Sequence, residues 1–216
     1  MPIPRTDAEM DLRDHRAIAF TLVELLVVIG VIAILVGLLF PAFRGVQDQA
    51  RKTQAKNDEI QIVTAVSAFY AEYGHYPCSA QSGEETDDFF AGDDDANNVL
   101  FDILRGDPAN GNVQTYNPKA IQFMAPAIAK DLVHPSSGIG GNGRLYDPWG
   151  SCYRVRIDNN YSGAVQNPYG SNAGFDPIEL GIVVWSIGKD QAGAINRTGA
   201  GDKKIGTNAD DVISWQ

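Results

Sequence analysis

The sequence has little of what metal-dependent enzymes and nucleic-acid-binding proteins use. It has two cysteines and three histidines in 216 residues, and 17 lysines and arginines against 27 aspartates and glutamates. Neither cysteine nor histidine occurs at the spacing of a zinc site or a redox pair. Binding to nucleic-acid phosphates relies on clustered basic side chains. The formal net charge of -10 therefore argues against nucleic acid as a partner.

Catalytic motifs are also missing. The sequence contains no nucleophile elbow and no P-loop, and its three histidines are scattered. The stretch Gly138-Ile-Gly-Gly-Asn-Gly143 matches the letters of GxGxxG, but a Pro-Ser-Ser loop precedes it and no helix pattern follows. A dinucleotide site needs a strand before the glycines and a helix after them. We therefore predict a flexible loop here, and a protein that is not an enzyme.

A long apolar run is the strongest feature that is present. Residues 20–43 carry a single charge, Glu24, near the start of the run. About 20 apolar residues span a bilayer, and a carboxylate in hydrocarbon costs a few kcal/mol or more unless a partner neutralises it. Glu24 therefore indicates a contact with another subunit. The simpler alternative is a plain membrane anchor, in which Glu24 has no role.

The residues Phe20-Thr-Leu-Val-Glu24, the apolar run and Pro41 resemble the N-terminus of type IV prepilins and type II secretion pseudopilins. The resemblance implies a leader, residues 1–19, which a prepilin peptidase removes between Ala19 and Phe20 before the new amino group is methylated. It also implies that Glu24 pairs with the N-terminal amine of a neighbouring subunit. Pro41 would kink the helix, because proline removes a backbone hydrogen bond.

The sequence departs from this family in two places. Ala19 stands where the family usually has Gly. The leader is not basic, and initiation at Met10 would give a more ordinary one.

The helix is expected to continue past the membrane segment. Residues 44–74 show apolar side chains at 3-4 spacing, with one track at Ile62, Val66, Phe69 and Tyr73 and a second at Ile60, Val63 and Tyr70. A single kinked helix from Phe20 to Tyr73 would be roughly 80 Å long. Gly74 and Pro77 are signals that end it.

Residues 75–216 are expected to form the globular domain. Residues 77–144 are rich in Gly, Asn, Asp and Pro and read as a long variable loop region, with short helical patches at 99–105 and 120–132. Strand patterns follow within 145–216, at 152–157, 179–187 and 211–215. A helix followed by three strands predicts an α+β fold with a small antiparallel sheet packed on the amphipathic face, which is the pilin-like architecture.

Two further blocks, Tyr73-Gly-His-Tyr-Pro77 and Tyr146-Asp-Pro-Trp-Gly-Ser-Cys-Tyr153, resemble those of the major pseudopilin of type II secretion. In the second block Pro148 presets φ and Gly150 permits a positive φ, as a tight turn requires. We assign this block a structural role.

The C-terminal part resembles the calcium loop of those pseudopilins. It comprises Trp185-Ser-Ile-Gly-Lys-Asp190, a Gly-rich stretch and Gly206–Trp215. Calcium takes six to eight oxygen ligands in a flexible geometry. The resemblance implies that Asp190 and Asp210 or Asp211 are ligands, and Asp202 lies in an inserted stretch between them. The alternative is a turn whose acids are merely solvated. The acid run at 84–95 is interpreted as a solvated loop, with metal binding as the alternative.

Cys78 and Cys152 would lie on the extracytoplasmic side, where disulfides persist. The sequence leaves two alternatives open, a disulfide between them or two buried thiols.

The function that the resemblance implies is that of a pseudopilin. The chain would be a single-pass protein of the bacterial inner membrane, with its N-terminus cytoplasmic and its C-terminal domain periplasmic. It would polymerise into a helical pseudopilus with copies of itself and other pseudopilins, on an inner-membrane assembly platform, to support type II protein secretion. The alternatives are a type IV pilin of a surface fibre for adhesion or motility, and a membrane-tethered calcium-binding domain that never polymerises.

Overall fold

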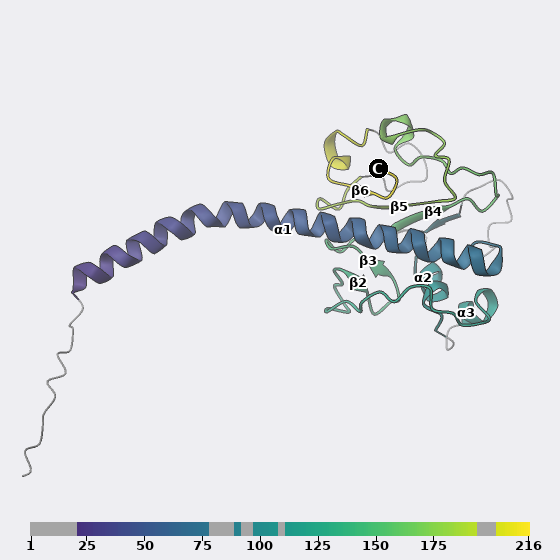
Figure 1. The fold of residues 1–216 in the computed structure, drawn as a ribbon, viewed down its shortest axis with the longest axis horizontal. Coiled ribbons are helices and arrows are strands. Elements are labelled where there is room, and N and C mark those ends of the chain that lie inside the picture. The colour runs from purple at the N-terminus through teal and green to yellow at the C-terminus, as the bar shows by residue number, and fades with distance from the viewer. Residues whose placement is uncertain (1–20, 78–88, 92–96, 108–110, 194–201) are drawn as a thin grey trace, which may run out of the picture. The chain divides into compact units, whose positions relative to one another are not determined.

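A computed structural model of the chain describes residues 21–77, 89–91, 97–107, 111–193 and 202–216 (Figure 1). The chain divides into two compact units, residues 1–46 and 47–216. Helix α1 (Leu22–Tyr73, 52 residues) contributes to both. The remaining helices and all strands belong to the second unit, so the fold is α+β, with a long N-terminal helix and small antiparallel sheets.

Helix α1 begins and ends close to the predicted positions. Within the described residues it starts at Leu22, where Thr21 caps it, and it continues through Pro41; Phe20 lies outside the described residues. Gly74 ends it with φ 73°, and the Gly74 N–H donates to the Tyr70 carbonyl at 2.8 Å. A positive φ is favourable for glycine and costly for other residues, so Gly74 is a standard helix C-cap.

The main sheet has four antiparallel strands in the order β1-β4-β5-β6. Their bounds are β1 Phe89–Ala91, β4 Arg154–Ile157, β5 Ile182–Ser186 and β6 Val212–Ile213. Strands β4, β5 and β6 confirm the three strands predicted from the sequence. Strand β1 is a finding of the structure: Phe89 pairs with Ile157, far along the chain.

The second half of α1 supplies the centre of the core. In Figure 1 the four-stranded sheet lies on one side of this part of α1, and α2, α3 and the β2–β3 pair lie on the other. Ile62, Val66 and Phe69 are fully buried in one cluster with side chains of α2, β4 and β5. The first predicted track is therefore correct. The second is wrong in part, because Ile60 and Tyr70 are 50% and 40% exposed.

The two central strands of the sheet, β4 and β5, are buried on both faces. Val184 of β5 belongs to the α1 cluster, while Val183 and Trp185 belong to a second cluster with Val165 and Tyr169 from the segment between β4 and β5. Side chains alternate between faces along a strand. A strand covered on both faces needs apolar residues at consecutive positions, which explains the sequence of β5.

The region 77–144 contains more structure than the predicted variable loop. It holds β1, α2 (Asn98–Arg105), α3 (Gly111–Tyr116) and β2 (Gly138–Ile139), which pairs with β3 (Leu145–Tyr146). Helix α2 confirms the patch predicted at 99–105. The helical patch predicted at 120–132 is wrong. Pro126 disfavours helix at the residue before it, and the Phe123 and Met124 N–H groups donate instead to the Leu104 carbonyl. The stretch Gly138–Gly143, predicted to be a loop, begins with β2.

An acidic residue occupies the buried face of α1. Glu59 is fully buried, at a position in register with Ala55, Ile62 and Val66. Neither carboxylate oxygen accepts a hydrogen bond of ordinary geometry from the described residues. Burial raises the pKa of Glu59 well above its ordinary value, while the Lys56 ammonium and the Ser186 N–H favour the ionised form. Glu59 therefore destabilises the fold when it is charged.

We expect Glu59→Gln to stabilise the folded domain at neutral pH. An acid whose pKa is raised by folding loses its stabilising contribution as pH rises from its unfolded pKa through its folded one. Wild type and variant should therefore unfold at similar temperatures near pH 4, and the variant should be more stable at pH 7. A gain of about 1 kcal/mol would raise the midpoint by about 2–4 °C in a domain of this size.

Thermal unfolding of the full chain in neutral detergent, measured from pH 4 to pH 8, provides the test. Glu72→Gln is the matched control, because Glu72 lies on the same helix, is partly exposed and pairs with Lys119. A Glu59→Gln variant that is less stable than wild type at pH 7 would contradict this account.

Candidate functional site

The apolar segment of α1 is exposed along its length. Its large side chains from Leu22 to Leu39 are about half to four-fifths exposed, for example Val28 at 47% and Leu22 at 79%. Among the described residues, α1 is the helix that is long and apolar enough to cross a membrane. Water-exposed aliphatic surface of this extent is unfavourable, at about 25 cal/mol per Å². The segment would therefore be stabilised by contact with a bilayer or with other protein chains.

Glu24 caps the helix in which it lies. Its Oε2 accepts hydrogen bonds from the Thr21 N–H at 2.9 Å and the Thr21 hydroxyl at 2.7 Å, and the Glu24 N–H donates back to the hydroxyl at 3.2 Å. This reciprocal pattern is a capping box. Both bonds to the carboxylate use Oε2, so Oε1 is available to a further donor. The spacing Thr-x-x-Glu is visible in the sequence and predicts this cap.

The other sequence-predicted residues of the N-terminal site lie largely outside the described structure. Ala19 and Phe20 are not among the described residues. Pro41 lies within α1, where only the backbone is described. Cleavage, methylation and the kink therefore stay predictions.

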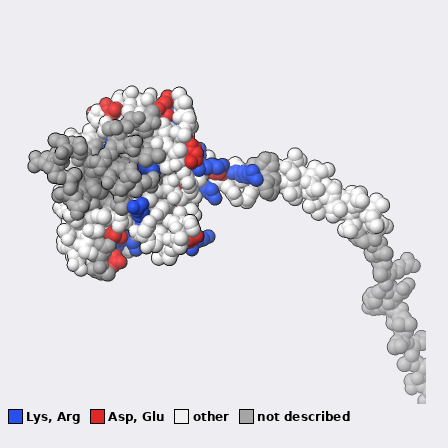
Figure 2. Space-filling view, turned by 180° about the vertical axis from the view of Figure 1, so that it is seen from behind, with Lys and Arg blue, Asp and Glu red and all other residues white. Residues whose placement is uncertain are grey.

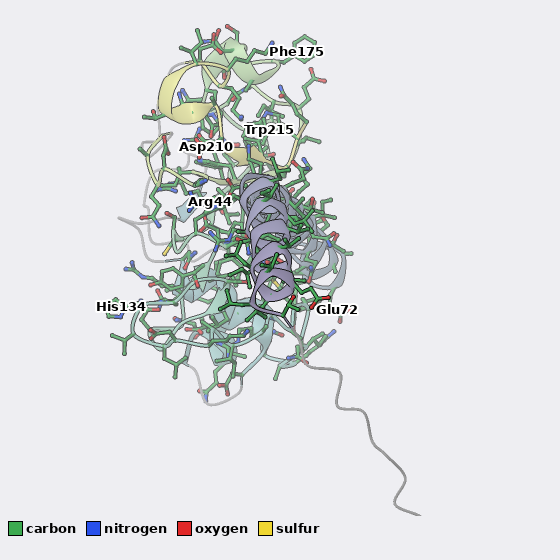
Figure 3. All side chains as sticks on the ribbon, turned by 90° about the vertical axis from the view of Figure 1, so that its left-hand side faces the viewer. Arg44, Glu72, His134, Phe175, Asp210 and Trp215 are labelled. Atoms are coloured by element: carbon green, nitrogen blue, oxygen red, sulfur yellow. The ribbon has the colours of Figure 1, made fainter. Side chains whose placement is uncertain are left out.

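The C-terminal loop connects β5 to β6, and Asp210 holds its first turn. The Asp210 Oδ2 accepts the Lys189 N–H at 2.6 Å and the Asp190 N–H at 3.1 Å. Gly188, with φ 70°, lies so close to Asp210 that an added Cβ would come within 2.6 Å of its carbonyl oxygen. The Asp210 side chain thus holds the backbone of the loop in place through these two hydrogen bonds. Figure 3 shows that Asp210 lies well away from His134.

Asp211 is the buried acid of this loop, and one of its carboxylate oxygens has unused binding capacity. It is 6% exposed, and its Oδ2 accepts the Tyr169 hydroxyl at 2.6 Å. Its Oδ1 is buried and accepts no hydrogen bond from the described residues. Burial raises the pKa of Asp211 to about 6, against the effects of the Tyr169 hydroxyl and the nearby Lys203. Such an oxygen is costly unless it gains a partner.

A glycine brings a second oxygen next to Asp211. A Cβ added at Gly193 would lie 2.8 and 3.0 Å from the two Asp211 carboxylate oxygens and 3.0 Å from the Asn208 side-chain oxygen. The Asp211 and Asn208 oxygens therefore face the same point of the backbone. Carboxylate and amide oxygens are ligands that calcium accepts. These two side chains fit a calcium ion, and Asn208 (5% exposed) was not expected from the sequence.

The other two predicted ligands lie in turns of their own. The Asp190 Oδ1 accepts the Ala192 N–H at 2.9 Å, and the Asp202 Oδ1 accepts the Lys204 N–H at 2.9 Å. The described residues contain no group of three or more His, Cys, Asp or Glu placed to hold a metal, and residues 194–201 of the loop lie outside them. Calcium therefore stays a prediction, with Asp211 as its best-placed ligand.

The Asp-Pro-Trp-Gly turn depends on its buried aspartate. The Asp147 Oδ1 accepts the N–H groups of Trp149, Gly150 and Ser151 at 2.8–2.9 Å, and its Oδ2 accepts the Ser186 hydroxyl. Gly150 adopts φ 98°, as predicted for this turn. The bond to Ser186 fixes the turn to the end of β5, where the C-terminal loop begins. The role of the block in this chain is therefore to position that loop.

The disulfide also stays a prediction. Cys152 is buried, at 2% exposure, and Cys78 lies outside the described residues.

Comparison of the chain with protein-family models, with curated proteins and with solved structures found no match.

We expect calcium to raise the unfolding temperature of the full chain at pH 7.5, because a ligand of the native state stabilises it. Calcium at 100 times its dissociation constant would add about 2.7 kcal/mol. The shift should shrink below pH 6, because protons compete for Asp211. Asp211→Asn should lose the shift, whereas Glu179→Gln, an exposed acid elsewhere, should keep it.

Thermal unfolding in neutral detergent with calcium or with chelator makes the measurement. An unchanged wild-type midpoint would rule out a calcium site. A full shift in Asp211→Asn would show that calcium binds elsewhere.

Proposed function

We propose that this chain is a non-enzymatic filament subunit, a pseudopilin. In this role the apolar segment of α1 holds it in the inner membrane until it polymerises through that segment into a periplasmic pseudopilus for type II secretion. The observation that carries the proposal is the exposed apolar segment with one carboxylate, Glu24, in the first turn of α1. The resemblance of residues 20–41 to prepilins supports it.

The chemistry of assembly follows from the cost of burying charge. In hydrocarbon or in the centre of a helical bundle, the Glu24 carboxylate costs several kcal/mol unless a cation pairs with it. Thr21 supplies two hydrogen bonds but no charge. Cleavage after Ala19 would create an ammonium group at Phe20. The ammonium of one subunit and the Glu24 Oε1 of the next would remove each other's burial cost, and the pairing would set the axial register.

In such a filament the globular unit of each subunit would lie on the outside. The Asp147 turn and the loop carrying Asp210 and Asp211 resemble those of the major pseudopilin, which favours secretion over a surface pilus. Calcium at Asp211 would order the loop before assembly. Genes for a secretin and an assembly ATPase beside this one, without a retraction ATPase, would favour the pseudopilin over the pilin.

We expect the membrane form to begin with a methylated Phe20. Expression of the full chain with a prepilin peptidase, followed by N-terminal mass analysis, should find residues 1–19 removed and one methyl group added. Ala19→Gly should be processed at least as fast as wild type. Recovery of uncleaved chain alone, from both proteins, would overturn the proposal.

We expect Glu24→Gln to assemble poorly although it folds normally. Glutamine keeps an oxygen for the capping box but loses the charge, and about 1.4 kcal/mol lost per contact weakens association tenfold. Thr21→Val makes the reverse change, since it removes the cap and keeps the charge. The yield of sheared filaments, measured by sedimentation and electron microscopy in cells with a type II assembly system, compares them.

The two variants separate the rival explanations. Loss of filaments in Glu24→Gln with near-normal yield in Thr21→Val supports charge pairing. Equal loss in both would mean that Glu24 acts only as a cap. Unchanged function in Glu24→Ala, together with an absence of filaments from the wild type, would favour a membrane-tethered domain.

A further inference from the structure

Basic side chains are concentrated on one part of this acidic protein. Between Phe43 and Asp58 the sequence has four basic residues against one acid, Asp48, and Asp48 pairs with Lys189, with 2.6 Å between the charged atoms. Figure 2 shows Lys and Arg atoms along this stretch of α1. The net charge of -10 repels anions from the protein as a whole. An anion can therefore bind only where basic side chains are grouped together.

An open pocket of about 450 Å³ lies where this stretch meets the C-terminal segment. Three of its lining residues are lysines, namely Lys52 and Lys56 from α1 and Lys203 from the β5–β6 loop. One acid, Asp211, also lines it, so the charge of the wall remains positive. Polar side chains of α1, including Gln49 and Asn57, complete one side.

The three lysine ammonium groups differ in how many hydrogen-bond partners they have. The Lys56 ammonium donates to the Ile213 and Gln216 carbonyl oxygens, and an ammonium has three N–H donors, so one remains. Neither the Lys52 nor the Lys203 ammonium has a hydrogen bond or salt bridge recorded with another described residue. Lys203 is only partly exposed, and it lines the same pocket as Lys52. Both lysines would gain from an anion between them.

We propose that this pocket, centred on Lys52 and Lys203, binds a phosphate-bearing anion. A phosphate group has several oxygens and can accept hydrogen bonds from two or three lysines at once. The volume exceeds that of a bare phosphate, so the ligand has room for an organic part that Gln49 and Asn57 can contact. Two sources share this chemistry. One is an anionic phospholipid headgroup, because Lys52 lies only nine positions after Phe43, the last residue of the apolar segment. The other is a soluble phosphate ester.

The test compares two double variants that remove the same charge. Lys52→Gln with Lys203→Gln removes the two pocket ammonium groups. Arg51→Gln with Lys204→Gln changes the adjacent exposed residues, neither of which lines the pocket. Both are made in the full chain and are studied with chelator and again with calcium, because Lys203 and the proposed calcium ligand Asp211 line the same pocket.

The soluble arm titrates glycerol 1-phosphate into the chain in nonionic detergent and follows heat or unfolding midpoint. The lipid arm compares unfolding in phosphatidylcholine nanodiscs with and without phosphatidylglycerol. We expect wild type and the control pair to respond in one arm, and the pocket pair to bind about tenfold more weakly. A response confined to one arm identifies the source as lipid or soluble ester.

Two results would overturn the proposal: no wild-type response in either arm, or equal weakening in both double variants, which would mean unspecific attraction. Lys52→Arg with Lys203→Arg keeps both charges and should bind within about threefold of wild type. If the Gln pair does not fold by circular dichroism, the single change Lys52→Gln replaces it, compared with Arg51→Gln. Full binding by that variant would also overturn the proposal.

Discussion

The burial of one face of α1 between the main sheet and α2 is the interaction on which the folded region depends. Ile62, Val66 and Phe69 have no exposed surface, and fully burying side chains of this size contributes about 1.5–3 kcal/mol each. The β2–β3 pair and the Asp147 turn are attached around this layer. The same helix carries the apolar segment at its other end, so the backbone of α1 joins that segment to the core of the globular unit.

The polar groups inside this core fall into two kinds. Asp147 is fully buried but accepts four hydrogen bonds, which offset part of the loss of water, although burial still raises its pKa. Glu59 is equally buried and lacks such bonds, so it costs stability at neutral pH. Buried acids of the first kind fix a backbone. Glu59 is of the second kind, so stability does not account for its place on this face of α1.

Local patterns predicted the elements that depend on local sequence. The 3-4 spacing of α1, the alternating pattern of β4, the apolar run of β5 and the turn glycine Gly150 were all visible in the sequence. Strand β1 was not, because its three residues pair with a strand more than sixty residues away. The prediction of a helix at 120–132 failed because Pro126 disfavours helix before it and because the Phe123 and Met124 N–H groups bond to the Leu104 carbonyl, so the segment is irregular. The burial of Glu59 and the bond from Ser186 to Asp147 are tertiary facts that no local pattern contains.

Glu24 and Asp211, the acids of the two proposed sites, each have one carboxylate oxygen without a hydrogen bond within the described part of the chain, but different partners can bind them. In Glu24 and Asp211 one carboxylate oxygen is bonded within the chain and the other takes no hydrogen bond recorded from the described residues. For Asp211 the surroundings are oxygen-rich and close to Gly193, which suits a metal ion. For Glu24 the surroundings are aliphatic side chains that need cover, which suits the ammonium group of another chain arriving with its own apolar helix. The neighbours of each acid, rather than its charge, therefore decide which partner can complete it.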